Sequence, residues 1–154
     1  MTDEHLRNLG RVAATFQAVE IRVAIWAWSL IGSDQAVGRM VTSQLPFGKL
    51  CLLAETLFQY RFPDSPTAVR FSDLMKRSLK AEEHRNQLFH SAWTVADAAG
   101  TVFRVKSTLK MGRGLFTQAP PVMVEEIVKV ADELRAIADD LEALIMETIP
   151  EQPR

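Results

Sequence analysis

The chain has 154 residues, of which 47% are hydrophobic and 24% are charged. These proportions are typical of a single soluble globular domain with a core of its own. The formal net charge of −1 provides no overall positive field that would hold a polyanion. Any contact with nucleic acid must therefore be local, or be made by an oligomer.

The single cysteine and the first residues of the chain indicate the compartment in which the protein is expected. Cys51 has no second cysteine with which to form a disulfide, and within its apolar run it is typical of a small core residue. Asp3 and Glu4 precede the first hydrophobic run, unlike the basic start of a secretory signal. No stretch of about 20 unbroken apolar residues could cross a bilayer. We therefore expect a cytoplasmic protein that makes no contact with membranes.

A long helical pattern without proline occupies residues 4–31 and ends at Gly32. Ser33 or Asp34 can cap the helix that follows. The second half of the pattern, residues 19–31, is apolar on nearly every side. Because a helix of this kind must be covered all round, we expect that part of its cover comes from another subunit.

Three more helices are predicted over residues 34–43, 46–61 and about 66–97. Pro46 fits the first turn of the second, where its missing N–H is harmless. Ser65 can cap the third helix and Pro66 can occupy its first position.

A different pattern follows, in which residues 101–107 alternate with period two and are rich in β-branched side chains. A turn at Gly112-Arg113-Gly114 and a return over 115–117 complete a predicted hairpin near 101–118. Pro120 and Pro121 end it, and a final amphipathic helix is predicted over 122–148.

The predicted fold class is all-α. We expect an up-down bundle of four to five helices in one domain, residues 1–154, with the small β-hairpin inserted before the last helix.

The candidate site is the sequence Arg85-Asn86-Gln87-Leu88-Phe89-His90 near the end of the third long helix. An arginine is almost never buried without a partner, yet at 100° per residue Arg85 falls in the middle of the apolar stripe. Asn86 lies about 100° away from it and His90 about 140°. Glu82 or Glu20 could form a structural ion pair with Arg85, or the arginine could belong to a functional site. The spacing of Glu82, Asn86, His90 and Trp93 predicts that these four share one side of the helix.

In its helical context this motif resembles the signature of the HEPN superfamily (higher eukaryotes and prokaryotes nucleotide-binding domains). That signature is an arginine, often followed by a polar residue such as asparagine, with a histidine several positions on. The resemblance implies a homodimer with the two motif helices facing each other, and many members are metal-independent RNA endonucleases that act as toxins or in phage defence. Arg85 and His90 match the defining catalytic positions, and Asn86 matches the polar one. An antitoxin or another partner protein is implied for such members.

These residue types suit RNA cleavage without a cofactor, because the RNA 2′-hydroxyl is the nucleophile. Histidine can move a proton near neutral pH, and arginine stays charged and binds phosphate through a planar fork. Asparagine can position the substrate or the arginine. The alternative interpretation is a noncatalytic helical dimer, of the kind that binds a nucleotide or a partner protein, in which Arg85 is structural.

Nearby cations could add positive potential to this site, or they could form an ordinary solvated face. They are Lys80, His84, Arg104, Lys106, Lys110 and Arg113. No metal site is predicted, since the three histidines include no pair three or four residues apart on one helical face. No glycine-rich phosphate loop occurs, because no helix with a Lys-Ser pair follows Gly112-Arg113-Gly114. The tryptophans at 26, 28 and 93 are interpreted as core residues.

Overall fold

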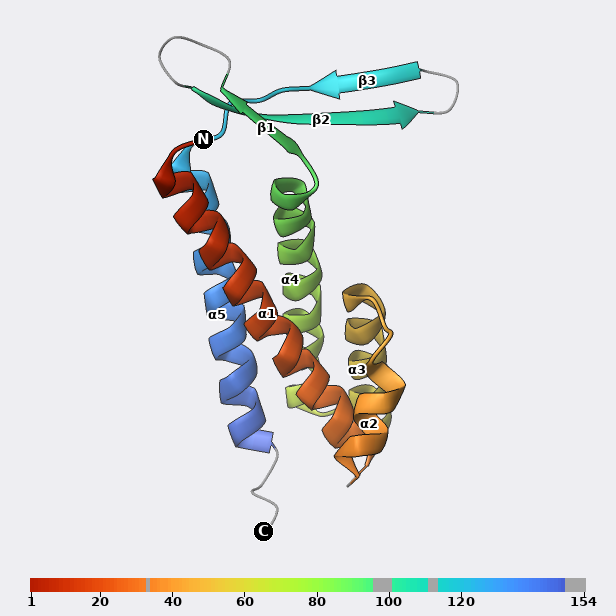
Figure 1. The fold of residues 1–154 in the computed structure, drawn as a ribbon. Coiled ribbons are helices and arrows are strands. Elements are labelled where there is room, and N and C mark those ends of the chain that lie inside the picture. Colours follow the sequence, from red (N-terminus) through yellow and green to blue (C-terminus); the bar gives the residue numbers. More distant parts are fainter. Residues whose placement is uncertain (33, 96–100, 111–113, 149–154) are drawn as a thin grey trace.

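The computed structural model of the protein describes residues 1–32, 34–95, 101–110 and 114–148, the side chains of 108–110 and 114–116 excepted. The elements in chain order are α1 (Asp3–Ile31), α2 (Gln35–Thr42), α3 (Phe47–Arg61), α4 (Pro66–Phe89), β1 (Ala92–Val95), β2 (Val102–Lys110), β3 (Gly114–Gln118) and α5 (Val124–Thr148). The helices pack as a bundle, and a three-stranded antiparallel sheet lies across one end of it (Figure 1). The predicted helical bundle is thus confirmed, with a sheet in place of a simple hairpin.

Helix starts follow the predicted capping signals. The Asp34 carboxylate accepts a hydrogen bond from the Ala36 N–H at 2.9 Å and begins α2. The Ser65 hydroxyl accepts one from the Thr67 N–H at 3.2 Å, and Pro66 is the first residue of α4. Ser33, the other candidate cap, lies outside the described residues.

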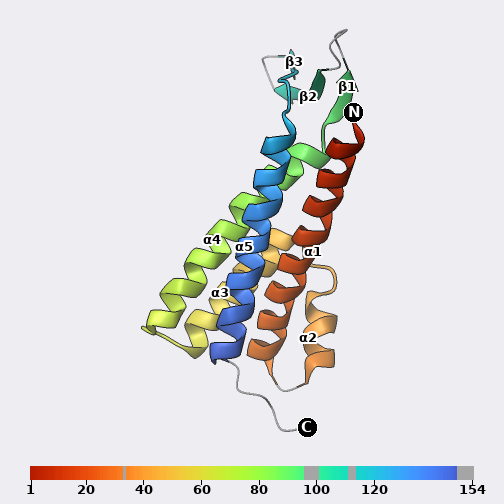
Figure 2. The ribbon, with the colours of Figure 1, turned by 90° about the vertical axis from the view of Figure 1, so that its left-hand side faces the viewer.

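The core is built around α1, which packs against all four other helices. Figure 2 shows α1, α5 and α4 running along the length of the bundle. Large aromatic side chains fill the part of the core near α3: the Trp26 ring lies 5.3 Å from Phe58 and 5.0 Å from Phe71 between centroids. Most of the predicted apolar face of α5 is buried against α1 and α4, including Ile127, Leu134, Ile137, Leu141 and Leu144.

The apolar second half of α1 is covered by other helices of the same chain, with α2 lying on the side of Trp28. A Cβ placed on Gly38 would lie 2.9 Å from Trp28 Cα, so only glycine allows this approach. The Trp28 indole N–H donates to the Thr42 hydroxyl at 2.7 Å, and the Arg39 guanidinium lies 5.0 Å from the Trp28 ring. The chain itself therefore supplies cover that we expected in part from another subunit, although Ile21 stays 42% exposed.

The end of α4 differs from the prediction, because the helix stops at Phe89 and not near residue 97. His90 leaves the helical conformation, with φ −98° and ψ 27°, and residues 92–95 form β1, which pairs with residues 102–105. Aromatic and β-branched residues such as Trp93 and Val95 favour a strand once a partner strand is available. That partner comes from a later part of the chain, which a local helical pattern does not reveal.

The sheet has the order β1-β2-β3, and its two outer strands pair with different halves of β2. β1 pairs with residues 102–105, whereas β3 pairs with residues 106–110. In the described residues, the outer half of β2 therefore has a partner strand on one side only. The bridge between Phe103 and Pro121 ends the pairing near the predicted proline stop.

None of the described helices is both long enough and apolar enough to span a membrane.

Candidate functional site

The candidate site lies at the end of α4 nearest the sheet, beyond the start of α3. A Cβ placed on Gly48, in the first turn of α3, would lie 3.7 Å from Leu79. Because α3 runs from Gly48 away from the sheet, the last turns of α4 have no α3 beside them. Arg85 and Asn86 occupy these turns, and His90 directly follows as the C-terminal cap.

Arg85 is half-buried, and its guanidinium is close to two aromatic rings. Its Cζ atom lies 4.9 Å from the centroid of the Phe16 ring, on α1, and 4.8 Å from that of Phe89. Nη1 donates to the Asn86 side-chain oxygen at 2.8 Å. Nε is buried and has no hydrogen-bond partner among the described residues. Of the two roles considered for Asn86, this hydrogen bond corresponds to positioning the arginine.

No carboxylate pairs with Arg85 in the described part of the chain. Neither Glu82 nor Glu20 forms an ion pair with it, and the Glu20 carboxylate instead accepts from Gln17 Nε2 at 3.1 Å. The interpretation of Arg85 as half of a structural ion pair is therefore wrong for these residues. Cation–π contacts compensate only part of the cost of removing a guanidinium from water, which leaves the group suited to an external anion.

His90 is exposed and is joined to the same turn through Asn86. Its backbone N–H donates to the Asn86 carbonyl at 2.9 Å, while its imidazole makes no hydrogen bond to any described residue. Trp93, predicted on the same helical side, is instead on β1, where its indole N–H donates to the Leu88 carbonyl at 3.0 Å. Asn86 thus contacts both defining residues, one through its side chain and one through its backbone.

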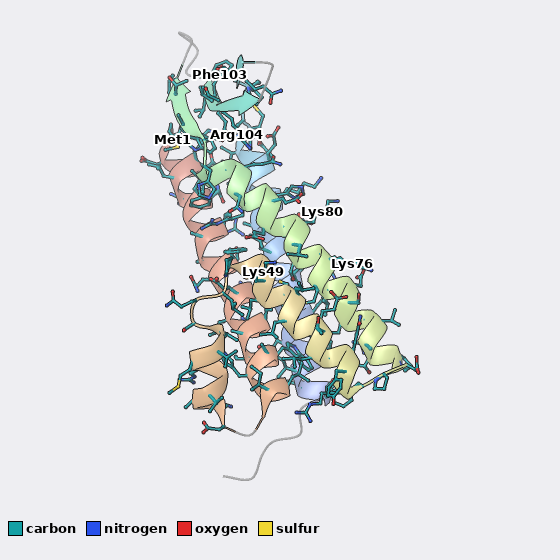
Figure 3. All side chains as sticks on the ribbon, turned by 90° about the vertical axis from the view of Figure 1, so that its right-hand side faces the viewer. Met1, Lys49, Lys76, Lys80, Phe103 and Arg104 are labelled. Carbon is teal, nitrogen blue, oxygen red and sulfur yellow. The ribbon has the colours of Figure 1, made fainter. Side chains whose placement is uncertain are left out.

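The predicted cations fall into two groups. His84 lies 3.3 Å from a Glu133 oxygen on α5, so a positive charge on this histidine would be neutralised by that carboxylate. Lys80, Arg104 and Lys106 form no ion pair with a described residue, and Figure 3 shows Arg104 and Lys80 on one side of the molecule. The Lys110 side chain and Arg113 lie outside the described residues.

Negative charge is concentrated on α5, although the net charge of the whole chain is close to zero. The helix α5 carries eight Asp or Glu and two Lys or Arg, a net charge of −6. Since the whole chain carries −1, the remaining residues carry +5. All six ion pairs of the described residues have their carboxylate on α5. Cations that lie away from α5 are therefore the ones left for an external anion.

Cys51 is fully buried, as expected for a core residue. Burial first, and then the nearby charges of Glu82, Glu55 and Glu20, raise its pKa from 9.0 to about 12.

The raised pKa of Cys51 predicts how stability depends on pH. Because the thiol stays protonated in the folded state and ionises in the unfolded state above pH 9.0, stability is retained below that pH and lost between pH 9 and 12. We expect the free energy of unfolding to fall by up to about 1.4 kcal/mol per pH unit there. Urea titrations should show a shallower fall for Cys51→Ala, and equal slopes for both proteins would contradict this.

A large hollow in the described part of the chain does not contain the motif residues. Its volume is about 900 Å³, and it lies at the α3–α4 turn, where Phe62, Pro66 and Asp73 contribute to its walls. It is at the opposite end of α4 from Arg85 and contains no histidine or cysteine. Among the described residues, no three His, Cys, Asp or Glu are grouped so that they could hold a metal ion.

The sequence identified the motif but not its surroundings. Phe89 is four residues after Arg85, a spacing that places it on the same helical face. Phe16 is on another helix, and nothing local indicated its contact. No protein-family model, curated protein or solved structure matches the chain.

Proposed function

We propose that the protein is a metal-independent RNA endonuclease of the HEPN type that acts as a homodimer. The observation that carries this proposal is the half-buried Arg85 guanidinium, which has no carboxylate partner and is linked through Asn86 to the turn that holds an unengaged His90. A role as a toxin or in phage defence, and an antitoxin partner, follow from the family resemblance alone.

The donors of Arg85 define how a phosphate would bind. A guanidinium has five N–H donors: Nε is enclosed by protein and one Nη1 hydrogen is engaged by Asn86. The end formed by Nη2 and the second Nη1 hydrogen is left for phosphate oxygens, and a charge-assisted contact there would stabilise the negative charge that develops on those oxygens during the reaction.

The reaction is transfer of the phosphodiester to the RNA 2′-oxygen. The bond from the 2′-oxygen to phosphorus forms and the bond from phosphorus to the 5′-oxygen breaks. One group accepts the 2′-hydroxyl proton and another gives a proton to the leaving 5′-oxygen, a pair of roles that two histidines can share. In the dimer, His90 of each copy supplies one of them. The products are a 2′,3′-cyclic phosphate and a 5′-hydroxyl.

The exposed side of α1 supports contact with a second copy. Five small or apolar residues and one polar residue, Gln17, line it at helical spacing: Leu6, Gly10, Ala13, Ala14, Gln17 and Ile21. The spacing of these residues is the same when the series is read from either end. A two-fold axis between Ala13 and Ala14 would therefore pair Leu6 with Ile21 of the second copy. Phe16 would lie only about 4 Å along the helix from that axis. Both Arg85 sites would then be on the same side of the dimer.

The test is incubation of the purified protein with mixed single-stranded RNA in EDTA, beside His90→Ala. We expect cleavage to persist in EDTA, to leave cyclic phosphate ends, and to fall by about 100- to 10,000-fold in the variant. Equal cleavage by both proteins, or none by either, would contradict the proposal. Light scattering at micromolar concentration that shows only a species of 17.3 kDa would contradict the dimer.

A noncatalytic dimer that binds a nucleotide or a partner protein is the second candidate. The observation in its favour is that Phe16 and Phe89 both contact the Arg85 guanidinium, an arrangement suited to binding an anion without further chemistry. Nucleotide or protein binding that depends on Arg85, in the absence of any cleavage, would support it.

A further inference from the structure

Residues 98–123, which include β2 and β3, hold four basic residues and no acidic one. We propose that the side of β2 that carries Arg104 and Lys106 binds the phosphate backbone of single-stranded RNA next to the Arg85 site. This inference rests on the proposed function, because it names a surface that would hold the strand whose cleavage is proposed there.

The orientation of β2 directs these cations toward the helices. Val102 is 3% exposed, and alternation along a strand places Arg104 and Lys106 on the same side as Val102. Arg104 is directly opposite Trp93 in the register of β1 and β2, so the two side chains share a face. Trp93 in turn donates to the Leu88 carbonyl in the last turn of α4. The basic side of β2 therefore faces the end of α4 that carries Arg85.

These cations are not neutralised within the described structure. All six ion pairs there end on α5, and neither Arg104 nor Lys106 takes part in one. Arg104 Nε is buried without a hydrogen-bond partner among the described residues, and Lys106 is exposed. Two cations in this condition attract a polyanion more strongly than cations already paired with carboxylates.

Further lysines lie along α4 and α3. Figure 3 places Arg104 above Lys80 and Lys76, with Lys49 on the neighbouring helix α3. None of these three lysines forms an ion pair with a described residue. The acidic helix α5 lies behind α4 in this view. An RNA strand bound beside β2 would thus lie on a side of the protein that carries unpaired cations. The carboxylates of α5 lie on another side.

The experiment measures RNA binding separately from cleavage. In the His90→Ala background, the affinity for a fluorescent 12-nucleotide single-stranded RNA is followed by anisotropy between 50 and 200 mM salt, with and without Arg104→Gln/Lys106→Gln. A single-stranded phosphate contact contributes a slope of about −0.7 in log affinity against log salt, so two lost contacts should make the slope shallower by about 1.4. Affinity at low salt should fall by at least tenfold.

The matched control removes two cations from α5 by Lys129→Gln/Arg135→Gln, which changes the net charge equally. This control should bind RNA within twofold of its parent, and circular dichroism should show unchanged helix content in all variants. Unchanged affinity and slope in Arg104→Gln/Lys106→Gln would overturn the proposal, as would an equal loss in the control. Cleavage by the wild type without RNA binding through the sheet would overturn this inference alone. Binding through the sheet without cleavage would support it and overturn the proposed function.

Discussion

Arg85→Met is expected to leave the protein folded while RNA cleavage falls by about 100- to 1,000-fold. The guanidinium has no carboxylate partner among the described residues, so its removal does not strand a buried opposite charge. Methionine retains apolar contact with Phe16 and Phe89 and removes the unpaired Nε donor. The loss of cation–π contacts, about 0.5–2 kcal/mol, is therefore offset in part. Urea unfolding and single-turnover cleavage measure the two effects separately.

A matched control for this substitution is Arg77→Met on the same helix. Arg77 pairs with Asp140 at 2.7 Å on a partly exposed surface, a pair expected to contribute at most about 1 kcal/mol. Cleavage should stay near the wild-type rate in this variant. If Arg85→Met instead destabilised the protein by about 3–5 kcal/mol, as happens when a buried ion pair is broken, Arg85 would be structural and the noncatalytic interpretation would be favoured.

Trp26→Ala is expected to lower the free energy of unfolding by about 3–5 kcal/mol. Trp26 is fully buried, and its ring packs edge-on against Phe58 and Phe71. Alanine would leave a cavity where α1, α3 and α4 meet, which the rigid helices can fill only in part. Urea denaturation of both proteins at pH 7 gives the difference directly.

Trp26→Phe should cost much less, below about 1.5 kcal/mol. The indole N–H of Trp26 is buried without a hydrogen-bond acceptor in the described structure, and its desolvation already penalises the folded state. Phenylalanine removes that donor while it keeps an aromatic ring beside Phe58. A cost for phenylalanine equal to that for alanine would contradict this, because it would mean that the retained ring contributes nothing to stability at this position.

Local signals in the sequence predicted the helices well but not the end of α4. Caps such as Asp34 and Ser65 act on residues two or three positions away, so their effect is visible in a short window. The strand β1 depends on pairing with residues 102–105, and the alanines around it are compatible with a continued helix. Only the tertiary partner decides between the two conformations.

In the candidate site too, local sequence predicted some features, and others depend on residues far apart in the chain. Arg85, Asn86 and His90 could be chosen from their spacing, and the contact of Arg85 with Asn86 follows from adjacency. The pairing of His84 with Glu133 joins two helices far apart in the chain and could not be anticipated. Likewise, the net charge of −1 does not indicate that α5 holds the carboxylates of all the described ion pairs, because a net charge does not say where in the structure the charges lie.

The one-sided pairing of β2 has a further consequence for the behaviour of the protein in solution. Residues 106–110 pair with β3 but, among the described residues, have no strand on the side where β1 has ended. An open strand edge is a template on which the same segment of a second chain can add, and this leads to aggregation. Lysine on such an edge opposes that addition because like charges would be brought together. Lys106 therefore has a second role in keeping neighbouring hairpins apart.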